Sequence, residues 1–260
     1  MAASSRDFSH VWIVAVFISW LVTTYAYDAF MEQQSLSWAF LVSLSLLLWS
    51  YLAALSTPPG TIPSEYVIGG DHRPATESTP LESLPMCLKC DRYKPRRAHH
   101  CSTCGQCILR YDHHCPWIAQ CVGFYNLREF LLLTLFTTLA AATYTVELWP
   151  RIAEVYHEVR DHNTTFLAKL RYLNLVGSFL MALLLAVGMA YFGLSHLYQM
   201  TKNVTTLEKV ISTTQDDAEI YNLGFRKNWV QACGDNPLLW CLPCPSQKGR
   251  TMDGTTFESV

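Results

Sequence analysis

The stretch CLKCDRYKPRRAHHCSTCGQCILRYDHHCPWIAQC, residues 87–121, holds seven of the ten cysteines of the chain, together with four histidines. Cysteines two residues apart, repeated over a short stretch, let several thiolates meet around one tetrahedral ion, which is typical of zinc sites. The histidines favour zinc over an iron–sulfur cluster, whose usual ligands are cysteines. Large apolar residues are few here, so we expect bound metal to supply much of the folding free energy.

A count of ligands leaves one cysteine over. Six cysteines other than Cys115 and two of the histidines would fill two Cys3His sites, each closed at four ligands and therefore structural. Cys115 lies in YDHHCPW, residues 111–117, where an acid and two imidazoles precede it. A nucleophilic cysteine needs a base beside it and an acid that orients the base. The alternative is that Cys115 is a further metal ligand or a spare thiol.

The rest of the chain is strongly apolar, since 50% of the 260 residues are hydrophobic and only 15% are charged. The apolar residues gather in four runs, Val11–Phe30, Leu36–Leu55, Phe130–Trp149 and Tyr172–Tyr198. Each has the length that a helix needs to cross a hydrocarbon core of about 30 Å. One such run could be a buried core helix, but four in one short chain indicate an integral membrane protein. We interpret the first as a retained helix, because it lacks a clear signal-peptide cleavage site.

The basic residues predict the topology. They are dense between the second and third runs and recur after the fourth, so residues 56–128 and both termini are expected to be cytosolic. The sequon at Asn163 would then face the lumen, although the same loop also carries basic residues. The reducing cytosol argues against disulfides in residues 87–121. The net charge of −2 suggests no nucleic-acid partner.

The sequence thus predicts an all-α integral membrane protein with four transmembrane helices and a cytosolic zinc-binding, cysteine-rich domain between helices 2 and 3. We expect helices 1 and 2 in residues 1–55, a linker at 56–86, the cysteine-rich domain at 87–128, helices 3 and 4 at 129–199, and a cytosolic tail at 200–260. The expected location is the endomembrane system, with the Golgi as the first candidate and the plasma membrane or endoplasmic reticulum as alternatives.

The pattern Cys87-x2-Cys90 … KPRRAHHCSTCGQC … DHHCPW … CVGFYN resembles the cysteine-rich domain of the DHHC protein S-acyltransferases, the protein palmitoyltransferases. The four-span layout is similar as well, so the resemblance covers nearly the whole chain, in the short-tailed subgroup without ankyrin repeats. Residues 205–208, TTLE, match the TTxE motif of the family, and Asn228 matches an asparagine of its C-terminal motif. The chain departs from the family at Thr57, before PPG where Asp-Pro-Gly is frequent, and at Gln120, where asparagine is commoner. Both departures concern local packing more than chemistry.

The resemblance implies a role for each residue of the stretch. Cys115 would be the nucleophile, His113 its base and Asp112 the acid that orients the base. One zinc ion would be held by Cys87, Cys90, His100 and Cys107, and the other by Cys101, Cys104, His114 and Cys121. The basic side chains of Lys94, Arg96 and Arg97 would face the phosphates of CoA. Orientation of the protein in the membrane is the alternative explanation of these charges.

The reaction of that family moves a long-chain acyl group such as palmitoyl from acyl-CoA, through a thioester on Cys115, to cysteine thiols of other proteins. It implies two structural zinc ions, an acyl-CoA donor, the lipid bilayer, and membrane-associated substrate proteins with juxtamembrane cysteines. We expect Asn126 to satisfy backbone groups at the end of the cysteine-rich segment, and Thr206 and Glu208 to tether the tail to it. Two rival hypotheses are a non-enzymatic membrane adaptor, in which Cys115 is dispensable, and a zinc hydrolase, which needs an open metal position.

Overall fold

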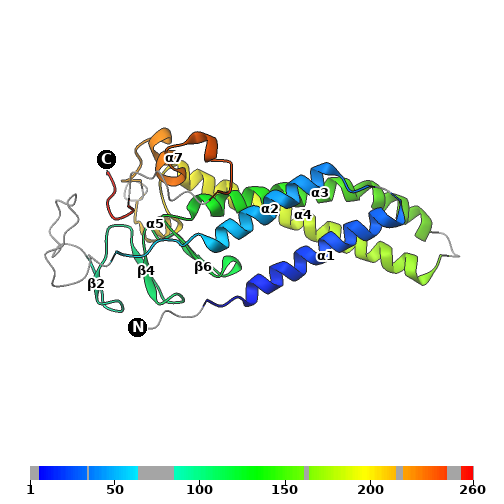
Figure 1. Ribbon diagram of the computed structural model, residues 1–260, viewed down its shortest axis with the longest axis horizontal. Coiled ribbons are helices and arrows are strands. Elements are labelled where there is room, and N and C mark those ends of the chain that lie inside the picture. The colour runs from blue at the N-terminus through cyan, green and yellow to red at the C-terminus, as the bar shows by residue number, and fades with distance from the viewer. Residues whose placement is uncertain are drawn as a thin grey trace. The chain divides into compact units, whose positions relative to one another are not determined.

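A computed structural model describes residues 6–33, 35–63, 85–160, 164–214, 219–244 and 253–259. Four long helices run through it: α1 Ser9–Met31, α2 Trp38–Ser56, α3 Leu127–Val159 and α4 Phe166–Thr201 (Figure 1). All four are long and apolar enough to cross a membrane. The predicted four-helix membrane protein is therefore confirmed. Most of the predicted linker at 56–86, and Asn163 of the sequon, lie outside the described residues.

The chain divides into two compact units. One is a helical bundle made of Trp12–Ser50 and Leu133–Leu194. The other combines Met1–Val11, Tyr51–Leu132 and Ser195–Val260, so that it holds the cysteine-rich segment, the tail and the adjoining helix ends.

Helices α3 and α4 are longer than the apolar runs that predicted them. In α3 the apolar side chains continue beyond Trp149 at helical spacing, at Ile152, Val155 and Val159, and these residues pack against the core of the bundle. Pro150 lies inside this helix without ending it. The helix exceeds the predicted run because the segment after Trp149 is amphipathic rather than uniformly apolar. The buried core of the bundle consists of Tyr25, Phe40, Tyr144, Leu148, Val155, Leu175 and Ala182.

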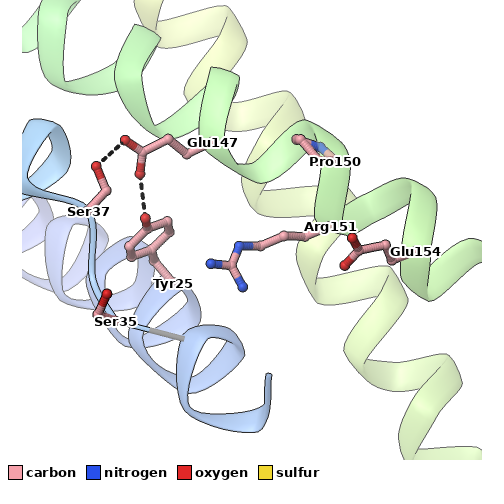
Figure 2. A pocket seen from close by; sticks show the side chains of 7 residues that line it. All are labelled: Tyr25, Ser35, Ser37, Glu147, Pro150, Arg151 and Glu154. Carbon is pink, nitrogen blue, oxygen red and sulfur yellow. Dashed lines mark hydrogen bonds between the residues drawn. The ribbon is translucent and has the colours of Figure 1, made fainter. Parts of the chain in front are cut away.

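Glu147 and Asp28 have polar partners inside the bundle, and Figure 2 shows those of Glu147. Glu147 accepts hydrogen bonds from the hydroxyls of Tyr25 and Ser37, the latter at 2.5 Å. The buried carboxylate of Asp28 pairs with Arg151 at 3.0 Å. Pairing makes ionisable groups tolerable in an apolar environment. A pocket of about 340 Å³ opens beside them, lined by Tyr25, Ser35, Ser37, Glu147, Pro150, Arg151 and Glu154.

The cysteine-rich segment folds as three short antiparallel hairpins between α2 and α3 (Figure 1). They are β1 Met86–Cys87 with β2 Arg92–Tyr93, β3 His99–Cys101 with β4 Gln106–Ile108, and β5 His113–Cys115 with β6 Gln120–Val122. A two- or three-residue hairpin is not stable alone in water. These strands carry cysteines and histidines, which bind metal. The short hairpins are therefore consistent with the prediction that bound metal supplies folding free energy.

The tail begins with α5 Thr206–Ile211, which starts at a capping box formed by Thr205 and Glu208. Helix α7 Phe225–Cys233 follows, with Asn228 buried in it. The Asn228 side chain donates to the carbonyl of Thr201 at 2.8 Å, and its oxygen accepts from the backbone of Leu223 at 3.0 Å. This asparagine therefore fastens the tail to the end of α4. A 3-10 turn at Pro237–Leu239 comes after α7.

Candidate metal clusters and the Asp112–His113–Cys115 site

The hairpin register brings the predicted metal ligands together. His100 lies opposite Cys107 in the β3–β4 pair, and His114 lies opposite Cys121 in the β5–β6 pair. Two groups of four result, Cys87, Cys90, His100, Cys107 and Cys101, Cys104, His114, Cys121. The groups interleave because adjacent strand residues point to opposite faces. In β3, His100 therefore belongs to one group and Cys101 to the other.

Both groups have the size and chemistry of a zinc site. The Nδ1 atom of His100 lies 3.7 Å, 3.2 Å and 3.9 Å from the sulfurs of Cys87, Cys90 and Cys107. In the second group, Nδ1 of His114 lies 3.4–3.7 Å from its three sulfurs. Tetrahedral ligands at the usual zinc–ligand distances are separated by about 3.5–3.8 Å. Both groups therefore fit zinc with four protein ligands each.

The strand alternation that sends His114 to the metal group also brings His113 and Cys115 together. These two residues flank His114 in β5 and share the opposite face of the strand. His113 donates from Nδ1 to Asp112 Oδ2 at 2.7 Å, and Cys115 is close enough to its ring to raise the pKa of that ring. Cys115 is buried, with 6% of its surface exposed. The three residues predicted to act together are therefore in contact.

The electrostatics of the site favour a charged Asp112 and a protonated His113. Burial alone would raise the pKa of Asp112, but the hydrogen bond and charge of His113, together with Thr206, hold it below its ordinary value. Burial alone would lower the pKa of His113, but Asp112 and Cys115 raise it to about 9. An acid, an imidazole and a thiol arranged in this way can move a proton between the thiol and the ring.

The loop after Cys115 is fastened to the end of α2. Pro116–Ile118 form a 3-10 turn, and Ala119 has a left-handed backbone with φ of 50°. The hydroxyl of Tyr51 donates to the carbonyl of Trp117 at 2.9 Å. The amide of Gln120 donates to carbonyls at the end of α2, including that of Ala54 at 2.5 Å. A glutamine in place of the commoner asparagine therefore serves as a cap for this helix.

Asn126 and the tail hold the site as predicted. The Asn126 amide donates to the carbonyl of Cys121 at 2.9 Å and accepts from the backbone of Gly123 at 2.8 Å. Thr206 donates to Asp112 twice, from its backbone at 2.7 Å and from its hydroxyl at 3.0 Å. The expectation that Thr206 tethers the tail is confirmed, and the tether ends on the acid of the site itself.

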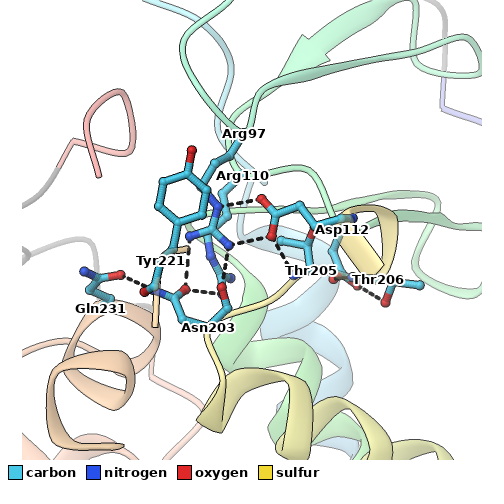
Figure 3. Close-up of polar contacts among 9 residues, drawn as sticks. Arg97, Arg110, Asp112, Asn203, Thr205, Thr206, Tyr221 and Gln231 are labelled. Carbon is cyan, nitrogen blue, oxygen red and sulfur yellow. Dashed lines mark hydrogen bonds and ion pairs between the residues drawn. The ribbon is translucent and has the colours of Figure 1, made fainter. Parts of the chain in front are cut away.

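Arg97 departs from its predicted role. It was expected to face CoA, but it is buried and makes two hydrogen bonds with the carboxylate of Glu208, at 2.7 Å and 2.8 Å (Figure 3). Asn203 accepts further hydrogen bonds from Arg97 and from Arg110, and the ring of Tyr221 lies 4.3 Å from the guanidinium. Arg97 makes four hydrogen bonds, all with Glu208 and Asn203, so its buried charge is paired within the protein rather than facing CoA. Local charge in the sequence could not reveal a partner 111 residues away.

The other two predicted CoA residues are accessible. Arg96 is exposed, and Lys94 is half-buried. His99, which belongs to neither predicted metal group, is half-buried with its ring 6.4 Å from that of Tyr111, outside both metal groups. Burial, followed by the charge of Lys94, lowers the pKa of His99.

Sequence reasoning missed His196. This residue lies near the end of α4, is 5% exposed, and has its Nδ1 atom 3.7 Å from Asp112 Oδ2. Its ring centroid lies 5.5 Å from that of His113. The signal was present, because a histidine inside an apolar span is by default a candidate for function.

The sequence of the chain is also similar to that of known proteins. Residues 81–213 match the family model described as DHHC palmitoyltransferase. The chain is 32% identical to probable protein S-acyltransferase 12 of Arabidopsis thaliana, over 78% of this chain and 71% of that protein. It is 30% identical to palmitoyltransferase ZDHHC20-A of Danio rerio and 29% identical to palmitoyltransferase ZDHHC20 of Homo sapiens, in both cases over 95% of this chain, and over 77% and 76% of those proteins. With more than half of its length in the family model, the chain belongs to the DHHC palmitoyltransferases and is a multi-pass membrane protein S-acyltransferase.

Proposed function

We propose that Cys115 carries the acyl group, as a thioester formed from palmitoyl-CoA or another long-chain acyl-CoA. The observation that carries this proposal is the His113 ring, which donates to Asp112 at one nitrogen and shares a face of β5 with Cys115, close enough for Cys115 to raise its pKa. Nucleophile, base and orienting acid are thus neighbours in one site. An adaptor with a dispensable Cys115 would have no need of this arrangement.

In the first half-reaction Cys115 and His113 react as a thiolate–imidazolium pair, in which the ring of His113 holds the proton of the thiol. A pKa of about 9 lets the ring hold this proton at neutral pH while the thiolate attacks the carbonyl carbon of the acyl-CoA. The carbon–sulfur bond to CoA breaks, and the departing CoA thiolate takes the proton from His113. Asp112 keeps the ring in the tautomer and orientation that both proton transfers need.

In the second half-reaction a cysteine thiol of a substrate protein gives its proton to His113 and attacks the acyl-enzyme. Cys115 leaves as a thiolate and recovers the proton from His113. One thioester is exchanged for another in each half, so the chain has to position groups and generate thiolates rather than drive an uphill step. Substrate cysteines close to the membrane surface fit a site that adjoins helix ends.

Zinc is assigned a structural role. The two groups of four would each hold one ion with no open position, and bound zinc would fix the β5–β6 hairpin that carries His113 and Cys115. A zinc hydrolase would need a ligand position for water, which a closed site lacks. The chemistry is therefore left to Asp112, His113 and Cys115.

Lys94 and Arg96 remain candidates for the phosphates of CoA, because both are accessible on the cysteine-rich segment. We further propose that this segment and both termini are cytosolic, and that the protein resides in the endomembrane system, with the Golgi as the first membrane to examine. The basic residues around the segment support this orientation.

Transfer from the isolated acyl-enzyme tests the proposed function. The purified protein is loaded with radiolabelled palmitoyl-CoA, freed of excess donor, and mixed with a membrane-anchored peptide that has one juxtamembrane cysteine. We expect label to leave the protein and appear on the peptide, and a peptide with serine at that position should remain unlabelled. Acylation of the cysteine peptide at the wild-type rate by Cys115→Ala protein would contradict the proposal.

A further inference from the structure

Asp112 is approached by two imidazoles. His113 comes from β5, whereas His196 comes from α4, 84 positions away from Asp112 in the sequence. Both His196 and Asp112 have 5% of their side-chain surface exposed. A buried histidine in an apolar helix is costly unless its polar atoms find partners. The carboxylate of Asp112 lies 3.7 Å from Nδ1 of His196.

The two oxygens of Asp112 are used differently. Oδ1 accepts from the backbone of Thr206 at 2.7 Å. Oδ2 accepts from His113 at 2.7 Å and from the Thr206 hydroxyl at 3.0 Å, and it is also the oxygen that His196 approaches at 3.7 Å. That distance is longer than a hydrogen bond. Catalytic hydrogen bonds are often long in the free enzyme and shorten when the reacting molecule binds.

The rings of His113 and His196 both pack against the side chain of Phe130. Phe130 makes T-shaped contacts with both imidazoles, at centroid distances of 5.1 Å to His113 and 5.3 Å to His196, while the two imidazoles are 5.5 Å apart. His113 therefore contacts both Phe130 and His196. Gln199 follows His196 by three residues on the same face of α4 and accepts a hydrogen bond from the Thr206 hydroxyl at 3.1 Å. The last turns of α4 therefore contact both Asp112 and the threonine that bonds it.

We propose that His196 is a positioning residue for acyl transfer. Its Nδ1–H holds Asp112 Oδ2 against rotation while a proton moves between Cys115 and His113, and its ring limits the orientations of His113. The inference rests on the proposed function, since it assigns His196 to the reaction at Cys115. His196 touches neither the thiol nor the acyl group in this account and acts through Asp112.

The test compares His196→Asn with His196→Gln. An asparagine amide occupies the place of Nδ1 in a histidine ring, whereas a glutamine amide occupies the place of Nε2. We measure single-turnover formation of the acyl-enzyme from palmitoyl-CoA and express the rate per zinc-loaded protein, so that poorly folded molecules do not count. We expect His196→Asn to stay close to wild type and His196→Gln to be slower by about tenfold, the effect of one lost hydrogen bond to a charged group.

Which of the two variants forms the acyl-enzyme faster decides whether the inference holds. A His196→Gln rate equal to or above that of His196→Asn would overturn it, because a packing role favours the side chain of more similar size. His157→Asn, a matched change at an exposed position of α3, should leave the rate unchanged. Wild-type protein that forms no acyl-enzyme would instead sink the proposed function, so the two failures are distinguishable.

Discussion

At the scale of single residues, the two faces of strand β5 carry different functions, metal binding on one face and the proposed acyl-transfer residues on the other. In β5, His114 points to a metal group while its neighbours His113 and Cys115 share the other face. Two adjacent histidines can therefore serve different purposes without competing for one ion. Asp112 lies directly before the strand and accepts a hydrogen bond from His113 at 2.7 Å.

The importance of Asp112 can be measured with Asp112→Asn. The amide keeps the shape of the carboxylate, but its NH2 group can face His113 Nδ1 and favour the wrong tautomer. We expect single-turnover acylation to slow by about 100-fold or more, with unchanged zinc content. Asp91→Asn, in an exposed turn of the same segment, is the matched control. Equal rates for the two variants would show that Asp112 does not orient the base.

At the scale of elements, α5 locks the tail onto the cysteine-rich segment. Its capping glutamate, Glu208, accepts two hydrogen bonds from Arg97, and the two side chains are 12% and 1% exposed. The Arg97–Glu208 ion pair lies close to the site, because Thr206, two residues before Glu208, donates a hydrogen bond to Asp112. Displacement of α5 would therefore remove support from Asp112.

Glu208→Gln should destabilise the protein at neutral pH, since breaking a buried ion pair costs about 3–5 kcal/mol. Burial would raise the pKa of Glu208, but Arg97 holds it below its ordinary value of 4.5. The ion pair therefore contributes fully above pH 4.5 and is lost as the pH falls through the folded pKa. Thermal unfolding is followed by tryptophan fluorescence in detergent. We expect the difference in thermal midpoint between wild type and Glu208→Gln to shrink as the pH falls below 4.5. A constant difference would refute the pairing, and the exposed Glu158→Gln serves as control.

The elements also show what the sequence could predict. Composition and run length identified four spans, because apolar helices of that length have few alternatives. The ligand count identified Cys115 as the surplus cysteine. The partners of Arg97 and His196 were beyond reach, because Glu208 and Asp112 lie far away in the chain and meet them only through the fold. The extension of α3 past Trp149 was readable from Ile152, Val155 and Val159, yet a search for uniformly apolar runs overlooks it.

At the scale of the whole molecule, four spans and one reactive thiol suit a reaction between a lipid-like donor and a membrane-associated protein. The orientation can be tested with glycosylation tags, in a background where Asn163→Gln removes the natural sequon. We expect a tag inserted after Thr164 to be glycosylated in microsomes and a tag at the C-terminus to stay unmodified, because the positive-inside rule places them on opposite sides. The reverse pattern would invert the proposed topology.

The most direct test of the central claim is the intact mass of purified protein after incubation with palmitoyl-CoA, compared with Cys115→Ser, and with zinc measured in both. We predict one added palmitoyl group on Cys115, removable by neutral hydroxylamine, no such group on the variant, and two zinc ions in each protein. A hydroxylamine-labile palmitoyl group on Cys115→Ser, or fully zinc-loaded wild-type protein without an adduct, would contradict the account and favour a non-enzymatic membrane adaptor.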